Sequence, residues 1–393
     1  MSFRYPLILL ILALCASCSQ PAAACELLDR QANGPGDAAG LLVDCLRSIP
    51  PGGQLLLRPG VYRIKRPIVV DKPVTITTVG LLNDRRGCAE QAPGRCATIL
   101  LDPGGAPAKP QSMMIEIAAD DVTLSHLIIR GAGISEARRA QCRVPTSRPL
   151  GGGLRVSGSR FTLRASALRD FACYTALEIT SGARKPTINA NVIGPNGDHS
   201  PGNIWSDGVT IHDSDHASVT GNLFIDNTDV QLILGGCREC RVESNRFRHS
   251  ASFSSASFAE LMLQAWPSTS GNYAGTIVRG NSIDCGERRR CGYGIMLGSA
   301  PWYKGVTSAA TVEENDISNA MMAINVDGLS GPVQIRNNRV RNSGGRFASD
   351  CGLRDWPAVN IAPSSRRYVQ GDPSNVEEGS VSTTGCLLNR RDR

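Results

Sequence analysis

The sequence predicts an all-β protein, a parallel β-solenoid with a short N-terminal capping helix. The first observation is composition: 393 residues contain 41 Gly and 23 Pro but only 5% aromatics, a mix typical of tight turns rather than a helical bundle. The second is a repeat. Asn followed by a short apolar pair recurs at gaps of 31, 23, 36, 34 and 23 residues, at Asn191, Asn222, Asn245, Asn281, Asn315 and Asn338. Without loop insertions the unit is about 20 to 23 residues, as in stacked coils.

The N-terminus has the features of an export signal. Arg4 precedes an apolar run over 7–14 that is too short to span a bilayer. Two processing routes stay open: cleavage after the three alanines 22–24, which leaves Cys25 first, or lipoprotein processing ahead of Cys18, giving a lipid anchor. We therefore expect a periplasmic, outer-membrane lipoprotein or secreted protein.

The domain plan follows from these patterns. A signal over 1–24 precedes an N-terminal cap over 25–52, a β-helix over 53–363 and a polar tail over 364–393. Within the cap, residues 37–50 place apolar side chains at helical spacing. A helix here would cover the unpaired edge of the first coil.

Twelve cysteines follow residue 24, an even number that indicates disulfides in an exported chain. We expect near neighbours to pair: Cys25/Cys45, Cys88/Cys96, Cys142/Cys173, Cys237/Cys240, Cys285/Cys291 and Cys351/Cys386. The CxxC at 237–240 lacks a second ligand pair, so no metal site is predicted there.

Each coil begins with a strand of alternating residues, such as "GVTIHDS", "VQLILGG" and "ELMLQAW". Their apolar members, including Val209/Ile211, Val230/Leu232 and Leu261/Leu263, are predicted to point inward. The alternate positions then face outward on coils about 4.8 Å apart. This alignment gathers a group of outward polar residues: Arg155, Glu178, Thr210, His212, Gln231, Glu260 and Gln264.

Candidate functional residues lie in and beside this group. We expect Glu178, Asp207, His212 and Asp229 to supply acid and base groups. Aromatic side chains near the strand ends suit the apolar faces of sugar rings: Trp205, Trp266, Trp302, Tyr303 and Trp356. Structural roles are expected elsewhere, with Asp213, Asp215, Asp226 and Asn227 accepting backbone N–H groups, His126 inside a coil, and His216 and His249 at surface turns.

Charge indicates the partner. The net charge is +7, and 37 of the 42 basic residues are Arg. A GC-rich genome explains the bias in one interpretation; recognition of carboxylates, which Arg binds with two parallel hydrogen bonds, explains it in the other. No nucleic-acid motif is present. We expect a monomer that binds an acidic polysaccharide.

The chain also resembles a known group of proteins. A helix, then "GGQLLLRPGVYRI", then "PIVVDKPVTI", then Asn-punctuated coils is similar to the pectate-lyase superfamily of right-handed parallel β-helices, over roughly 37–363. That superfamily includes polysaccharide lyases, glycoside hydrolases, epimerases, esterases and adhesins. "SDGVTIHDSDHASVTGNLF" with "DVQLILGG" resembles the pectate-lyase segment whose acidic residues hold calcium, which implies Ca²⁺ at Asp207 and Asp229. The family's Arg segment is matched only by Arg246 and Arg248, without its flanking Pro and Gly.

Three functions stay open. Lyase β-elimination is favoured by the basic charge, with Arg155, His212 and Glu178 as carboxylate neutraliser, base and acid. A glycoside hydrolase would instead pair Glu178 with Asp207 or Asp229, or Glu260 with Asp229. A non-catalytic polysaccharide-binding protein would keep the aromatics alone.

Overall fold

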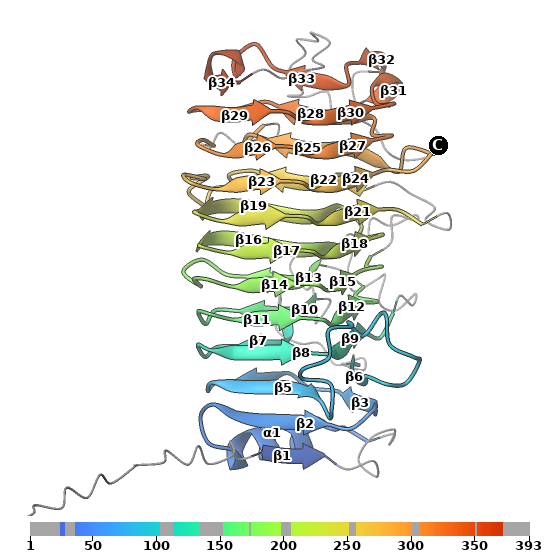
Figure 1. Cartoon of the computed structure of the whole chain (residues 1–393), viewed down its shortest axis with the longest axis vertical. Coiled ribbons are helices and arrows are strands. Elements are labelled where there is room, and N and C mark those ends of the chain that lie inside the picture. The colour runs from blue at the N-terminus through green and yellow to red at the C-terminus, as the bar shows by residue number, and fades with distance from the viewer. Residues whose placement is uncertain are drawn as a thin grey trace, which may run out of the picture.

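A computed structural model describes residues 24–27, 36–102, 113–133, 152–172, 174–197, 206–250, 257–300, 307–349 and 352–371. The strands stack as coils along one axis, from the N-terminal cap to the C-terminal coils (Figure 1). Neighbouring strands pair in parallel, apart from one antiparallel hairpin. The predicted all-β solenoid with one capping helix is therefore confirmed.

Three long parallel sheets form the walls of the solenoid. Sheet A contains β1 (Ala24–Leu27), β2 (Gly53–Leu57), β5 (Val74–Thr78), β8 (Val122–Ser125), β11 (Thr162–Arg164), β14 (Thr187–Asn189), β17 (Ser218–Thr220), β20 (Arg241–Glu243), β23 (Ile277–Arg279), β26 (Thr311–Glu313), β29 (Val333–Arg336) and β34 (Val369–Gln370). Sheet B contains β3 (Gly60–Ile64), β6 (Ala97–Leu101), β9 (Leu127–Gly131), β12 (Ala167–Arg169), β15 (Val192–Ile193), β18 (Leu223–Ile225), β21 (Arg246–Arg248), β24 (Ser282–Asp284), β27 (Asp316–Ser318) and β30 (Arg339–Arg341).

Sheet C carries the long strands whose sequences suggested a site. It contains β4 (Ile68–Val70), β7 (Met113–Ile117), β10 (Gly152–Val156), β13 (Tyr174–Ile179), β16 (Ser206–Asp215), β19 (Val230–Arg238), β22 (Ser257–Leu263), β25 (Cys291–Leu297), β28 (Met322–Val326) and β33 (Val359–Ile361). The chain runs from sheet C to A to B and then enters the next coil, as in β13, β14, β15 and β16. A single apolar core of Leu, Ile, Val and Phe fills the space between the three sheets, because no one coil could bury its inward residues alone.

The repeated asparagines form a buried ladder between sheets A and B. From Asn222 to Asn338, each side-chain Oδ1 accepts the backbone N–H of the asparagine one coil before, at 3.0–3.1 Å. The residue that precedes each asparagine has a positive φ, such as Ser244 at 57° and Glu314 at 56°. The unusual backbone angle thus belongs to the preceding residue, and the asparagine supplies the side-chain hydrogen bonds.

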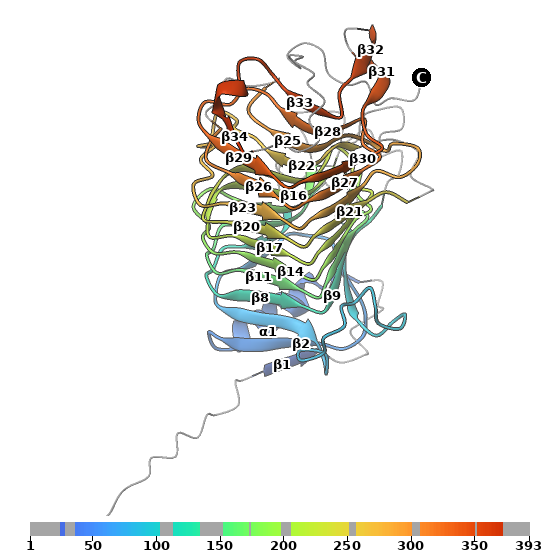
Figure 2. The same ribbon diagram turned by 45° about the horizontal axis from the view of Figure 1, so that its top comes forward.

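The N-terminal end is capped as predicted. Helix α1 (Ala39–Ser48) lies by the first coils (Figure 2) and buries Ala39, Leu42, Cys45 and Leu46. The Cys25–Cys45 disulfide ties α1 to β1, the first strand of sheet A. Of the other predicted disulfides, Cys88–Cys96, Cys237–Cys240 and Cys285–Cys291 are present, while Cys142/Cys173 and Cys351/Cys386 lie outside the described residues, as do most of the predicted signal and the tail beyond residue 371.

The C-terminal coils carry an added hairpin. β31 (Gly345–Ser349) pairs antiparallel with β32 (Gly352–Trp356), and a short 3₁₀ turn, η1 (Arg366–Tyr368), follows. Trp356 and Phe347 of the hairpin join Met262, Met296 and further apolar residues of sheet C in a second apolar cluster. In the described part of the chain, no helix has both the length and the apolar character needed to cross a membrane.

Candidate functional site

Polar side chains follow one another across the outer face of sheet C at β7, β10, β13 and β16. The strand register pairs Glu116 with Arg155, Arg155 with Glu178, and Glu178 with Thr210. His212 lies two residues after Thr210, on the same face of β16. These five residues are called the polar strip below. The sequence placed all but Glu116 on one outer face, and the structure brings them together.

Glu178 is the centre of the polar strip. Its side chain is 5% exposed and accepts hydrogen bonds from Arg155 Nε at 2.6 Å and from Tyr174 Oη at 2.9 Å. His212 Nε2 lies 3.0 Å from the same carboxylate. Tyr174 was missed in the sequence, although its position four residues before Glu178 in the same strand is the signal that could have found it.

These contacts decide the charge of Glu178. Burial alone would raise the pKa of this carboxyl, but the hydrogen bonds from His212 and Arg155 and the charge of Arg155 outweigh burial and lower the pKa to about 2. Burial and the neighbouring Glu178 carboxylate raise the pKa of Tyr174 to about 12. At neutral pH Glu178 is therefore an anion and Tyr174 a neutral donor. A carboxylate with this pKa does not act as a general acid.

His212 combines contact with Glu178 and access from outside. Its side chain is 23% exposed, and its ring meets the ring of Trp266 edge to face, with centroids 5.3 Å apart. We assign the Nε2 proton to the bond with Glu178. Nδ1 then carries the lone pair, and among the described residues it has no hydrogen-bond partner. This arrangement allows His212 to accept a proton from a bound molecule.

Trp266 is held over sheet C by a turn that returns to neighbouring strands. Ser270 donates to the Asp213 carboxylate from its backbone N–H at 2.7 Å and from its hydroxyl at 2.5 Å. The N–H of Gly271 donates to the carbonyl of Gly235 at 2.9 Å. The expected role of Asp213, accepting a backbone N–H, is thus observed, and its effect is to fix the turn that carries Trp266.

The two aspartates of the calcium prediction lie one coil apart. Asp207 is buried, and its carboxylate accepts the N–H of Val230 at 3.0 Å and the hydroxyl of Thr210 at 3.3 Å. Asp229 is half-buried at a positive φ of 78°. Within the described ranges, no cluster of three or more His, Cys, Asp or Glu could hold a metal ion. The two aspartates alone do not supply the six or more oxygens of a Ca²⁺ shell, and no step of the reaction is assigned to calcium.

Gln231 and Glu260 are not part of the exposed face, contrary to the expectation from aligning the strands of successive coils. Both are fully buried, and Gln231 Nε2 donates to Glu260 at 2.8 Å. The Gln231 Oε1 accepts from the backbone N–H of buried Asn227 at 3.2 Å and from its Nδ2 at 2.6 Å, and these bonds hold the side chain inside. The register also differs from the expected one, because Val209 pairs with Leu232 and Thr210 is followed by Ile233. Gln264, also expected outside, is 2% exposed and donates to the carbonyl of Ser299 at 3.4 Å.

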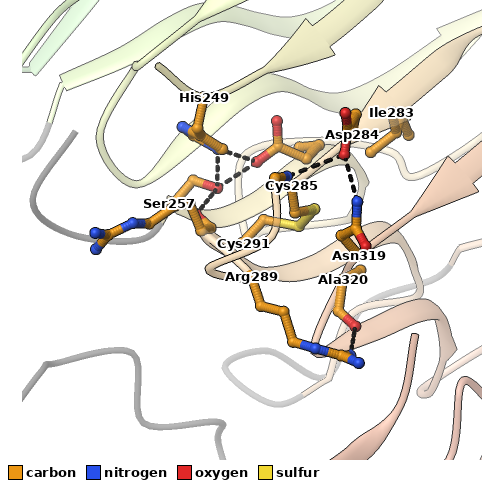
Figure 3. The surroundings of a disulfide bond; sticks show 12 residues. His249, Ser257, Ile283, Asp284, Cys285, Arg289, Cys291, Asn319 and Ala320 are labelled. Carbon is orange, nitrogen blue, oxygen red and sulfur yellow. Dashed lines mark hydrogen bonds and ion pairs between the residues drawn. A yellow bond between two sulfur atoms is a disulfide. The ribbon is translucent and has the colours of Figure 1, made fainter. Parts of the chain in front are cut away.

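His249 is a second correction, because it is buried rather than at the surface. Its side chain is 0% exposed and lies between two carboxylates, with Nδ1 3.3 Å from Asp226 and Nε2 2.9 Å from Glu260. Ser257 donates to Glu260 and lies 3.2 Å from His249 Nε2, beside the Cys285–Cys291 disulfide (Figure 3). Burial opposes the charge of His249, yet the two carboxylates raise its pKa to about 9. This set resembles a Ser-His-Asp arrangement, but a protonated histidine offers no base to the serine.

The remaining predicted positions divide into three groups. Trp205, Trp302 and Tyr303 lie outside the described residues. His126 is buried within a coil, as expected, and His216 is 46% exposed beside Glu239. Trp356, the fourth tryptophan, is 3% exposed within the hairpin cluster and cannot contact a sugar.

Much of the arginine excess binds carboxylates of the same chain. Arginine–carboxylate pairs link adjacent coils: Arg160 with Asp120 and Asp121, Arg238 with Asp215, Arg279 with Glu243, Arg336 with Glu313, and Arg341 with Asp316. Arg246 and Arg248, the positions that resemble the lyase Arg segment, are exposed on β21 of sheet B and not on sheet C. Arg155 is the arginine of the polar strip.

Comparisons with known proteins bear on the fold. No family model and no curated protein matches the sequence. Among solved structures, the chain is similar to an endo-xylogalacturonan hydrolase from Aspergillus tubingensis (12% identity, 92% of this chain and 100% of that one, TM-score 0.61). It is also similar to an alginate lyase from Paenibacillus sp. str. FPU-7 (12%, 78% and 95%, 0.55) and to PfbA, a surface adhesin of Streptococcus pneumoniae (14%, 82% and 89%, 0.50). These likenesses confirm the right-handed parallel β-helix expected from the resemblance, while a shared fold leaves the chemistry open.

Proposed function

We propose that this protein is an exported enzyme that cleaves a uronate-containing polysaccharide by β-elimination on the polar strip. The observation that carries the proposal is Glu178, an ionised carboxylate that contacts Arg155, Tyr174 and His212 at once, beside Trp266. The four disulfides of the described chain suit an oxidising compartment. The fold is shared with enzymes named for alginate and xylogalacturonan cleavage.

Each group of the polar strip has a role in such a reaction. His212 Nδ1 takes the proton from C5 of the uronate; the electron pair of that C–H bond forms the C4–C5 double bond, and the C4–O bond to the leaving sugar breaks. Tyr174 gives its hydroxyl proton to the leaving oxygen. Water then returns a proton to Tyr174 and takes the one held by His212, which resets both groups. Arg155, whose side chain is 24% exposed, stabilises the negative charge on the uronate carboxylate. Glu178 orients His212 through its contact with Nε2.

Hydrolysis fits these groups less well. A glycoside hydrolase needs one carboxyl group protonated as the acid and a second ionised one. Glu178 has a pKa of about 2, and the Asp207 carboxylate is buried with two hydrogen bonds. Glu260, which the last of the expected pairs would combine with Asp229, is buried beside His249 and Gln231. We therefore place lyase chemistry ahead of hydrolysis.

A panel of uronate-containing and neutral polysaccharides tests the proposal. Cleavage should produce the ultraviolet absorbance of an unsaturated uronate, and His212→Ala should lower the rate by about 100-fold or more while polymer retention persists. His216→Ala, at an exposed histidine in the turn between β16 and β17, is the control and should keep full activity. Reducing ends without ultraviolet absorbance would indicate a hydrolase, and retention without any cleavage a binding protein; either result contradicts the proposal.

A further inference from the structure

The exposure of the outer face of sheet C changes from one end of the solenoid to the other. Toward the N-terminal cap the face is open, with Val69 51% exposed and the Glu116 side chain 40% exposed. At the polar strip Arg155 and His212 keep about a quarter of their side chains exposed. Two coils farther on, Met262 is 1% exposed, and the following coils remain covered. A chain lying along this face thus meets a covered surface on the C-terminal side.

The Trp266 turn forms the first part of this cover. His212 pairs in register with Gly235, since Ile211 pairs with Leu234. A Cβ added to Gly235 would lie 2.7 Å from Trp266 Cζ2 and 2.6 Å from Thr269 Cγ2, so the indole and its turn rest directly on this strand. The bonds of Ser270 to Asp213 described above hold the turn in place.

The hairpin forms the second part of the cover. Met262 and Met296 continue the row of Thr210 and Ile233 across β22 and β25. They are packed in one apolar cluster with Phe347 and Trp356, and Trp356 Nε1 donates to the Phe347 carbonyl at 3.2 Å. At Met262 and Met296 the row is therefore apolar and buried.

From this arrangement we infer that the enzyme acts from a chain end, with the Trp266 turn as the stop. The Trp266 indole lies on the coil next to His212, with the two ring centroids 5.3 Å apart. A bound chain can therefore extend past His212 on this side by no more than about one sugar ring, roughly the 4.8 Å spacing of one coil. The rest of the polymer extends toward Glu116 and the cap. The inference rests on the proposed function and adds the mode of cleavage to it.

The test compares product size with the number of bonds broken, on the polymer of the panel that the wild-type protein cleaves. Attack from a chain end gives one short product from the earliest time point, while the viscosity of the polymer falls little. Attachment of the polymer to beads through one of its ends should block cleavage, and attachment through the other should not. A ladder of intermediate sizes with an early loss of viscosity overturns this inference and leaves the proposed function standing. Absence of cleavage on every polymer overturns both.

A pair of variants tests Trp266 itself as the stop. Trp266→Gly removes the indole and should add longer oligomers to the products, whereas Trp266→Phe keeps an aromatic ring and the short product. Thermal melting shows whether each variant is folded. A folded Trp266→Gly protein that still releases the short product alone contradicts the assignment of Trp266, and the bead experiment tests the mode of cleavage independently of any variant.

Discussion

At the scale of single residues, Glu178 and His249 show that contacts, rather than residue type, set the charge of a buried group. Glu178 is surrounded by three donors and stays ionised, while His249 lies between two carboxylates and stays protonated. In both cases hydrogen bonds and opposite charges outweigh burial. The first group can orient a catalytic base; the second holds strands of two sheets together.

Glu178→Gln should reduce activity by about 100-fold or more, because His212 loses its anionic partner. It should also lower the free energy of unfolding by about 2 kcal/mol, because Arg155 loses its ion pair. Glu313→Gln is the matched control: Glu313 is 9% exposed and pairs with Arg336 at 2.8 Å on sheet A. This control should be destabilised similarly but keep full activity. Equal activities of the two variants would argue against the role of Glu178.

His249 predicts a loss of stability at alkaline pH. Its pKa is about 9 in the folded chain against 6.5 for an ordinary histidine. The stabilisation is therefore complete below pH 6.5 and is lost as pH rises through about 9. As the pH is raised from 6.5 to about 9, the melting temperature of the wild type should fall, and that of His249→Gln should change less. The same slope in both proteins would show that another group titrates.

At the scale of elements, the sequence predicted which strands exist better than which residues pair. In "VQLILGG" the alternating Val230, Leu232 and Leu234 allow two alignments with Val209 and Ile211. A shift of two residues keeps every apolar side chain inward, so the pattern of alternation cannot distinguish them. The structure pairs Val209 with Leu232, and this choice places Gly235, not Ile233, beside His212.

The asparagine ladder is expected to stabilise the contacts between successive coils. Asn245 accepts from the N–H of Asn222 at 3.0 Å and donates to the carbonyl of Val219 at 2.8 Å. Asn245→Ala leaves these buried groups unpaired and should lower the free energy of unfolding by about 3 kcal/mol. Asn83→Ala, at an exposed asparagine of a turn, should change it by less than about 1 kcal/mol. Similar denaturation midpoints for the two variants would contradict a stabilising ladder.

At the scale of the whole molecule, stacking brings distant parts of the chain to one surface. Arg155, Glu178 and His212 come from three successive coils, and Trp266 reaches them from a turn after β22. Stacking also leaves an edge at each end, which must be covered to prevent association with other strands. Helix α1 and its disulfide to β1 serve this purpose at the N-terminal end.

Replacing Cys25 and Cys45 by Ser should destabilise the cap. The bond spans 20 residues, and loss of a loop of this size removes about 3 kcal/mol. We expect a lower melting temperature together with association that increases with concentration, measured by size-exclusion chromatography. The Cys88/Cys96 pair spans only 8 residues, away from the first coil, and its replacement should lower the melting temperature without association. Association of both variants would point to a cause other than the open edge.

The sequence alone determined the coil repeat with its recurring asparagines and the capping helix, because each depends on local spacing and on which residues can be buried. It predicted the pairing of neighbouring cysteines, which spacing does not fix, and the structure confirms four of these disulfides. The sequence also placed Glu178 and His212 on one face. Tertiary structure alone decided the burial of Gln231, Glu260 and His249, the contacts of Tyr174 and Trp266, and the covered end of sheet C. These features depend on the register between coils, on the turn that carries Trp266 and on the β31–β32 hairpin. Such contacts join residues whose separation in the sequence follows no repeat.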